Sequence, residues 1–192
     1  MNKPMNFLIS LLILMSITAV SCKTTGINSN VMDINGMIYD FSNRPVPNCD
    51  VKLGSRYKGT TDINGRFTIP NVSMGSHTFS GMKAGYETYC EEIDIRDRGQ
   101  IIYIRIPSQN QLLNLADEAL SANNLSLADE LAERALIIDN QNIESIFYCA
   151  AVKFRINEFE QAMDLLETAR LLDPRNIYVE KFLIALKEAQ NE

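Results

Sequence analysis

Two stretches of this chain repeat each other at a spacing of 34 residues. The first begins at Asn123 and reads NNLSLADELAERALIIDNQN, and the second begins at Asn157 and reads NEFEQAMDLLETARLLDPRN. Among the residues that recur, Ala128, Ala135 and Asp139 of the first stretch correspond to Ala162, Ala169 and Asp173 of the second. A repeat of this length is a helical hairpin that cannot bury its apolar face alone. We therefore expect hairpins that stack on one another.

Small side chains mark the places at which the two helices of each predicted hairpin approach most closely. Larger residues there would force the helices apart, because the side chains at a contact set the distance between helix axes. These positions hold Ala116, Ala128, Ala135, Ala150, Ala162 and Ala169. A third amphipathic helix over 177–190 has no hairpin partner, and we expect it to cover the open face of the second unit.

The repeat period, the alanines and Pro174 after the second unit resemble a tetratricopeptide array. The resemblance implies a groove for a protein or peptide partner, lined by the first helix of each unit and by the capping helix. By position within the units, it places the groove at Leu113, Asp117, Leu120, Phe147, Ala151, Phe154, Arg155, Tyr178 and Lys181. One alternative stays open, in which Phe147 and Phe154 pack against the preceding domain or a neighbouring helix.

Residues 31–106 follow a different pattern, in which short runs of alternating apolar and polar side chains are separated by Gly, Pro and Asn. The clearest runs are Met37–Tyr39, Val51–Leu53, Arg66–Ile69, His77–Phe79, Glu92–Ile95 and Ile101–Ile106. Asn35–Gly36 and Asn64–Gly65 have the composition of turns. This pattern predicts a small antiparallel β-sandwich of six or seven strands.

The same region resembles the carboxypeptidase regulatory-like domain. The resemblance rests on Gly36–Asp40, Arg44–Val51, Thr61–Phe67, Gly75 and Lys83–Tyr86. It implies a transthyretin-like sandwich that serves as an accessory module of exported bacterial proteins and has no catalytic residues. The expected fold class is thus α+β multidomain, with this sandwich followed by an all-α array of two hairpins and a capping helix.

The N-terminal residues have the layout of a secretory signal. Lys3 is basic, and the apolar run Phe7–Val20 has 14 residues, fewer than the roughly 20 that span a bilayer. Ala19–Cys22 resembles a bacterial lipobox, which implies cleavage before Cys22 and lipid on its sulfur. The alternative is an ordinary secretory signal. We expect a lipid-anchored envelope protein, on the periplasmic face of the inner or outer membrane or on the cell surface.

These expectations divide the chain into four parts. They are a signal peptide at 1–21, a lipidated polar tether at 22–30, the sandwich at 31–106, and the repeat domain at 107–192 with units at about 109–142 and 143–176.

Charge separates the two predicted domains. Residues 23–106 hold ten basic and nine acidic side chains, whereas residues 107–192 hold seven and fifteen, a net charge of −8. Binding to nucleic acid requires clustered Lys and Arg, and no such cluster exists in the sequence. We therefore expect no nucleic-acid partner. The resemblance of the repeats implies a protein or peptide partner and that of Ala19–Cys22 implies membrane contact through Cys22, whereas the sequence does not define the oligomeric state.

Residues with the chemistry for catalysis or metal binding do not form a recognisable set. His77 is the only histidine, and consecutive carboxylates such as Glu91–Glu92 point to different faces of a strand. We therefore expect no enzyme activity, no metal and no cofactor. Cys49 and Cys90 both lie on predicted strands, so a disulfide between them is one alternative and two free thiols the other.

Two functions compete. In the first, the chain is a non-catalytic, membrane-anchored scaffold or adaptor that binds proteins through its helices. In the second, the sandwich binds carbohydrate or cell wall and the helices act as a spacer. Sugar sites usually stack on exposed aromatic side chains, and the chain has no Trp.

Overall fold

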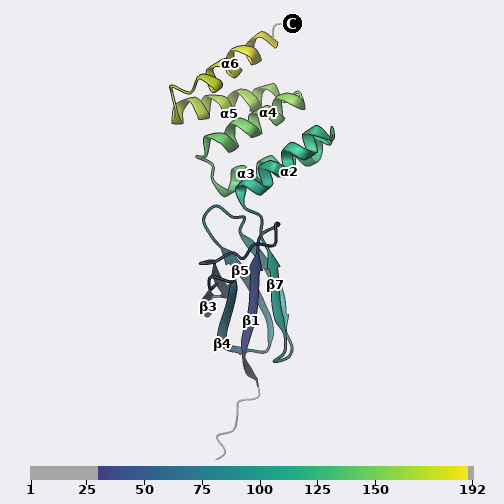
Figure 1. Cartoon of the computed structure of the whole chain (residues 1–192), viewed down its shortest axis with the longest axis vertical. Helices are drawn as coiled ribbons and strands as arrows, with labels where there is room; N and C mark the ends of the chain where they lie inside the picture. The colour runs from purple at the N-terminus through teal and green to yellow at the C-terminus, as the bar shows by residue number, and fades with distance from the viewer. Residues whose placement is uncertain (1–29, 190–192) are drawn as a thin grey trace, which may run out of the picture. The chain divides into compact units, whose positions relative to one another are not determined.

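The computed structural model describes residues 30–189, in which seven β-strands precede five α-helices (Figure 1). The predicted signal peptide, Cys22 and the tether up to residue 29 lie outside the described residues. Within residues 30–189, no helix is both long enough and apolar enough to cross a bilayer.

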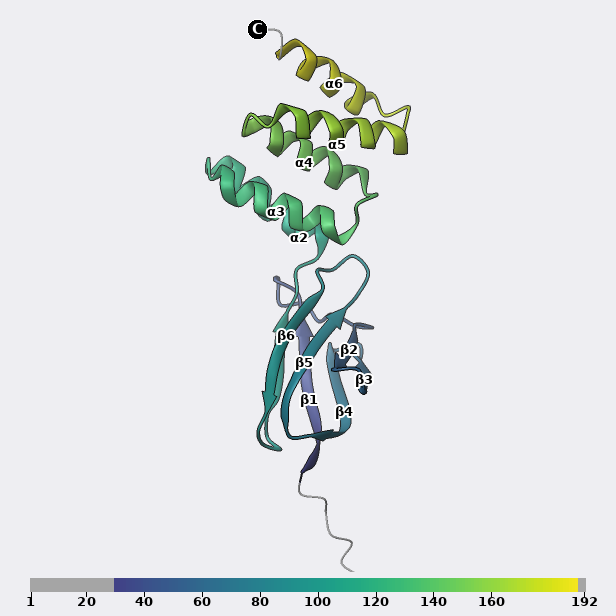
Figure 2. The same ribbon diagram turned by 180° about the vertical axis from the view of Figure 1, so that it is seen from behind.

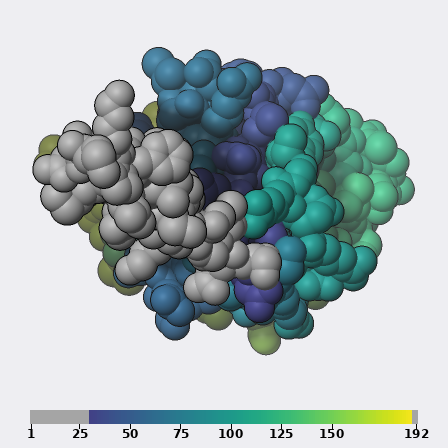
Figure 3. Space-filling view, turned by 90° about the horizontal axis from the view of Figure 1, so that it is seen from below, coloured from purple at the N-terminus to yellow at the C-terminus, as the bar shows by residue number. Residues whose placement is uncertain are grey.

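The strands form two sheets, which Figures 1 and 2 show from opposite sides. One sheet has the order β4-β1-β7, with β1 (Val31–Tyr39) between β4 (Arg66–Ser73) and β7 (Ile101–Arg105). The other has the order β3-β2-β5-β6 and consists of β2 (Asp50–Leu53), β3 (Tyr57–Thr60), β5 (Gly75–Met82) and β6 (Tyr89–Ile95). In Figure 3, purple atoms from the beginning of the described chain lie between blue and teal ones.

The expectation of a purely antiparallel sandwich was wrong at one pair of strands. β1 runs parallel to β7, with Asn35 opposite Ile101 and Tyr39 opposite Arg105. A tight hairpin would force an antiparallel pair, but β7 follows β6 of the other sheet and reaches β1 from far along the chain. Its direction is therefore set by the crossover between the sheets. The class α+β is correct.

The core of the sandwich follows the two-residue period of its strands. Ile34 and Ile38 of β1, like Ile102 and Ile104 of β7, point inward and are almost fully buried. The prediction of a turn at Asn35–Gly36 was wrong, because both residues lie inside β1. Gly36 instead provides room, since a Cβ atom there would lie 2.6 Å from Cε1 of Phe67 and 2.7 Å from the carbonyl oxygen of Ile102.

The helices form hairpins that pack in sequence order: α2 on α3, α3 on α4, α4 on α5, and α5 on α6. Their bounds are α2 (Gln109–Ser121), α3 (Leu125–Ile138), α4 (Ile143–Arg155), α5 (Phe159–Leu172) and α6 (Ile177–Ala189). The six alanines predicted at the helix contacts are all fully buried. Residues 109–189 therefore form a tetratricopeptide-like array of two hairpins and a further helix.

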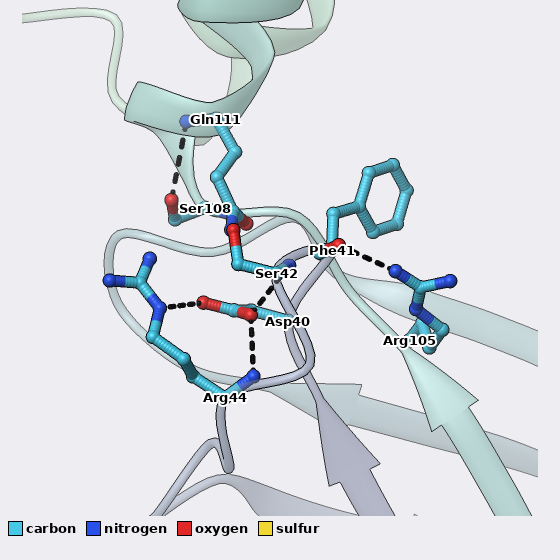
Figure 4. A network of polar contacts seen from close by, with 7 residues as sticks. All are labelled: Asp40, Phe41, Ser42, Arg44, Arg105, Ser108 and Gln111. Atoms are coloured by element: carbon cyan, nitrogen blue, oxygen red, sulfur yellow. Dashed lines mark hydrogen bonds and ion pairs between the residues drawn. The ribbon is translucent and has the colours of Figure 1, made fainter.

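Only residues 106–108 separate the last strand from the first helix (Figure 4). Ser108 caps α2, and its side chain and that of Gln111 form a capping box. The backbone N–H groups of Gln109 and Glu87 donate to the carbonyl oxygens of Gly85 and Pro107, each at 3.0 Å. Two backbone hydrogen bonds thus fix the start of α2 on the β5–β6 loop.

A turn after β1 adds a second attachment (Figure 4). Asp40, only 2% exposed, accepts hydrogen bonds from the backbone N–H groups of Ser42 and Arg44 and from Nε of Arg44. Burial disfavours the charged form of Asp40, but these hydrogen bonds outweigh burial and hold its pKa below the usual value. The turn presents Ser42, whose Oγ accepts a hydrogen bond from Nε2 of Gln111 at 2.9 Å.

Candidate interaction surface

Most apolar side chains of the groove predicted on the first helices are packed against other helices. Leu113 is 7% exposed, and Leu120 packs against the same cluster between the helices. Phe147 and Phe154 contact Phe182 of α6, with ring centroids 5.4 and 5.7 Å apart. The two phenylalanines therefore lie against a neighbouring helix, which was one of the two alternatives left open by the sequence.

The remaining residues of that groove stay at the surface and are mostly polar. Asp117, Arg155, Tyr178 and Lys181 are exposed, and Ala151 is half-buried. Asp117 of α2 accepts a hydrogen bond from the hydroxyl of Tyr148 of α4 at 2.9 Å. Burial, followed by this hydrogen bond, raises the pKa of Tyr148, so Tyr148 stays protonated and links the two helices at neutral pH.

An apolar groove of about 410 Å³ lies on the other side of the hairpins, between the second helices. We call it the α3–α5 groove, and it is lined by Glu133, Leu136, Ile137, Cys149, Lys153, Gln161, Asp164 and Leu165. Cys149 and Lys153 of α4 are almost fully buried and form its floor. Its walls come from α3 and α5, because those lining residues are half-buried or exposed.

Exposed apolar side chains stand at equivalent positions of the two repeats. Ile137 on α3 is 81% exposed, and Leu171, which lies one repeat later on α5, is 80% exposed. Neither contributes to the core of its own hairpin. Ile137 belongs to the wall of the α3–α5 groove, so an apolar surface extends from the groove to solvent.

Lys153 neutralises part of an acidic cluster at the floor. Its Nζ lies 2.7 Å from Oδ1 of Asp129, 2.6 Å from Oε1 of Glu133 and 3.4 Å from Oε2 of Glu158. Burial would lower the pKa of Lys153, but hydrogen bonds with Asp129 and Glu133 more than offset it and raise the pKa. Three carboxylates around one ammonium leave an excess of negative charge beside the groove.

The alternative of a disulfide between Cys49 and Cys90 was wrong, because both are free thiols. Cys49 is fully buried in the sandwich core, while Cys90 is exposed on β6. Cys90 pairs with Ser80, which also pairs with the exposed Lys52, so Cys90 lies on the outer face of the sheet. Val51, next to Lys52, is buried, and Cys49 lies two residues before Val51 on the same inner face. The two sulfurs therefore point to opposite faces of one sheet.

Sequence reasoning missed the α3–α5 groove, although one signal for it was present. Ile137 and Leu171 are 34 residues apart, in places where the outer face of an amphipathic helix should be polar. Among residues 30–189, no group of three or more His, Cys, Asp or Glu side chains is placed to hold a metal ion.

Comparison with known proteins gives partial structural similarities. No protein-family model and no curated protein sequence matches the chain. The first tetratricopeptide domain of Spaghetti (RPAP3) bound to an HSP90 peptide is 16% identical over 44% of this chain and 68% of that one, with a TM-score of 0.41. MamA is 20% identical over 44% of this chain and 49% of that one, with a TM-score of 0.40.

A third similarity is with a cohesin–X-dockerin complex from Acetivibrio cellulolyticus, which is 22% identical over 40% of this chain and 58% of that one, with a TM-score of 0.33. Each similarity covers less than half of the present chain. The description of the helices as tetratricopeptide-like therefore rests on their own period and packing. The resemblance of the sandwich to carboxypeptidase regulatory-like domains stays a prediction.

Proposed function

We propose that this chain is a non-catalytic adaptor that binds a partner protein through its helical half. The α3–α5 groove with the exposed side chain of Ile137 carries this proposal. A hollow of this size can receive one or two apolar side chains of a partner, and exposed apolar surface next to it is typical of an interaction site. The hairpins support it rigidly, because they bury their alanines against one another.

The proposal includes attachment to a membrane of the bacterial cell envelope. It is supported by the sequence pattern of Lys3, Phe7–Val20 and the lipobox-like Ala19–Cys22, all outside the described residues. Only eight residues, from Lys23 to Asn30, separate Cys22 from the predicted start of the sandwich. Stable anchoring requires two or more acyl chains. A partner would then meet the adaptor close to the lipid surface.

Affinity capture from the native envelope tests the binding function. The full chain is compared with Ile137→Ser and with a matched control, Ile63→Ser, which changes an 80% exposed isoleucine of the sandwich. We expect Ile137→Ser to weaken capture of specific partners by about tenfold. Tenfold in affinity is about 1.4 kcal/mol, close to the free energy gained by burying a large part of one apolar side chain. Equal capture by all three proteins would contradict the proposal.

Anchoring has its own test. Cells that express the full chain are given a labelled fatty acid, and the label in the protein is measured with Cys22 present and in Cys22→Ala. We expect the label, and retention in the membrane fraction, to depend on Cys22. Labelling that persists in Cys22→Ala would rule out this anchor without bearing on the groove.

One observation favours the alternative, carbohydrate binding by the sandwich. Tyr39 and Tyr103 lie side by side on β1 and β7 with ring centroids 5.9 Å apart, and Tyr103 is 55% exposed. Exposed aromatic faces can stack on sugars. Glycan-array binding that is lost in Tyr103→Ala and kept in Ile137→Ser would favour this alternative over the adaptor.

A further inference from the structure

We propose that the α3–α5 groove receives a positively charged amphipathic helix of the partner protein. This inference rests on the proposed function and specifies the chemistry of its partner. Apolar residues on one face of that helix would enter the groove, and Lys or Arg residues beside them would face the groove's acidic walls.

The walls and floor of the groove explain the apolar part of the partner. Leu136 and Leu165 are half-buried on opposite walls, with Cys149 beneath them and Ile137 at the rim. Burial raises the pKa of Cys149 to about 11, so this thiol is uncharged at neutral pH and acts as an apolar surface. A leucine-like side chain that enters the groove therefore meets apolar atoms on three sides.

The negative charge of the two walls explains why we expect Lys or Arg residues on the partner helix. Helices α3 and α5 together carry six acidic and two basic side chains, a net charge of −4. Both basic side chains are already paired, Arg134 with Glu87 and Arg170 with Glu167. Glu133 and Asp164 line opposite walls and are exposed. Basic residues that flank an apolar anchor would face both.

The groove favours a helix over an extended peptide as the binding element. An extended peptide gains affinity by adding a strand to an open sheet edge. Both walls here are helices, whose backbone N–H and C=O groups are used within the helix apart from its ends. A helix places apolar anchors at every third or fourth residue and keeps its own backbone satisfied. Side chains alone then make the contact.

A second copy of this chain is a poorer occupant. Residues 107–192 carry a net charge of −8, so two such halves repel each other where they meet. A basic partner is attracted by the same charge. The occupant we commit to is therefore a basic amphipathic helix.

Synthetic peptides test the inference with the full chain. The probe is a fluorescent helical peptide of about four turns, with Leu at every third or fourth position and Lys beside each Leu. One control peptide replaces every Lys by Glu, and another has the same composition in an order that breaks the apolar stripe. Anisotropy gives each affinity at two salt concentrations, and amide shifts in NMR spectra locate the bound peptide.

We expect binding of the basic amphipathic peptide only, with amide shifts in α3 and α5 and weaker binding at high salt. Ile137→Ser should weaken binding about tenfold, and Asp164→Asn about threefold at low salt. Ile63→Ser should leave binding unchanged. Equal binding of the control peptides, or shifts confined to α2, α4 and α6, would overturn the inference.

The remaining outcomes separate this inference from the proposed function. If Ile137→Ser reduces partner capture but the basic peptide does not bind, the groove is an interaction site for a partner of different chemistry. If neither effect is found, both proposals fail. Self-association in analytical ultracentrifugation that disappears in Ile137→Ser would make the groove an interface between copies and would also overturn the basic-helix proposal.

Discussion

Lys153 is a buried cation, and the carboxylates around it determine what its removal costs. Its side chain is only 6% exposed, whereas those of Asp129, Glu133 and Glu158 are 23%, 53% and 42% exposed. In Lys153→Met the carboxylates lose their common partner and repel one another. Breaking a fully buried pair costs about 3–5 kcal/mol, and partial exposure reduces this to about 2 kcal/mol here. Urea denaturation at neutral pH measures the loss.

The control for this substitution is Lys181→Met, which removes an exposed lysine of α6. We expect it to change the free energy of unfolding by less than about 0.5 kcal/mol. The folded-state pKa of Lys153 is raised, so its contribution is complete below the unfolded lysine pKa of about 10.4 and is lost only as the pH rises further. A cost that varies strongly between pH 6 and 9 would contradict this assignment.

The three described cysteines should differ sharply in their reaction with iodoacetamide. Cys90 is exposed, while Cys49 and Cys149 are buried. Burial raises the pKa of both buried thiols to about 11, so at pH 8 they are almost entirely in the unreactive neutral form. We expect native protein to be alkylated at Cys90 within minutes and at the other two only after denaturation, as mass spectrometry can show. Resistance of Cys90 to alkylation in the native protein, or rapid alkylation of Cys49 or Cys149, would contradict this expectation.

At the residue scale, the sequence predicted the buried alanines but not the environment of the charged and thiol groups. The alanines could be found because the repeat aligns them with one another. The burial of Lys153 depends on α3 supplying two carboxylates and α5 a third from its N-terminal end, and no local pattern shows this. The strand pattern near Cys49 and Cys90 likewise did not show which face each sulfur occupies.

Gly36 should be one of the least replaceable residues of the sandwich, because it lies where β1 meets the ring of Phe67. In Gly36→Ala the new methyl group would lie 2.6 Å from Cε1 of Phe67 and 2.7 Å from the oxygen of Ile102. One of those contacts is with backbone, which cannot turn away. We expect a loss of about 2–3 kcal/mol in free energy of unfolding, typical of overpacking.

Gly54→Ala is the matched control, because a Cβ there meets nothing within 4 Å. Its φ of +59° makes alanine strained, so we expect a loss of about 1 kcal/mol. Thermal denaturation followed by circular dichroism compares the two variants. Equal losses would mean that the backbone at Gly36 relaxes and that the close approach to Phe67 is unimportant.

At the element scale, the helices were predictable and the strands only partly so. Apolar periodicity over 13 or 14 residues defines each helix. β3 (Tyr57–Thr60) was missed because it has only four residues, none of them fully buried. The parallel pairing of β1 with β7 depends on the route of the chain between the sheets, which the strand sequences do not contain.

At the scale of the whole molecule, the candidate site depends on residues that the packing of helices brings together. Its walls belong to different repeats and its floor to a third helix. The sequence predicted stacked hairpins and placed the groove on their first helices. It could not show that Phe182 of α6 covers Phe147 and Phe154, nor that the space between α3 and α5 stays open.

The ion pair between Glu87 and Arg134 connects the β5–β6 loop to α3. Both oxygens of Glu87 accept hydrogen bonds from the guanidinium, at 2.8 Å each. The pair is partly shielded from water, because the side chain of Glu87 is 30% exposed and that of Arg134 is 33% exposed. Its fixed two-bond geometry favours a net contribution, because little side-chain entropy is lost per hydrogen bond. If the sandwich stabilises the short helical array, this pair is one of the contacts that transmit the effect.

A double-mutant cycle with Glu87→Gln, Arg134→Gln and both together measures that contribution. We expect a coupling energy of about 1 kcal/mol in urea denaturation, because a bidentate, partly buried pair exceeds the surface median. The control cycle uses Asp94 and Arg96 at the end of β6, whose side chains are 47% and 78% exposed. Its coupling energy should be below about 0.3 kcal/mol. We also expect the parent chain to unfold in a single transition. Once the pair is removed, the helices should unfold at a lower urea concentration than the strands. Coupling of the same size in both cycles would mean that the Glu87–Arg134 pair adds no more stability than an ordinary surface ion pair. The pair would then not transmit stability from the sandwich to the helices.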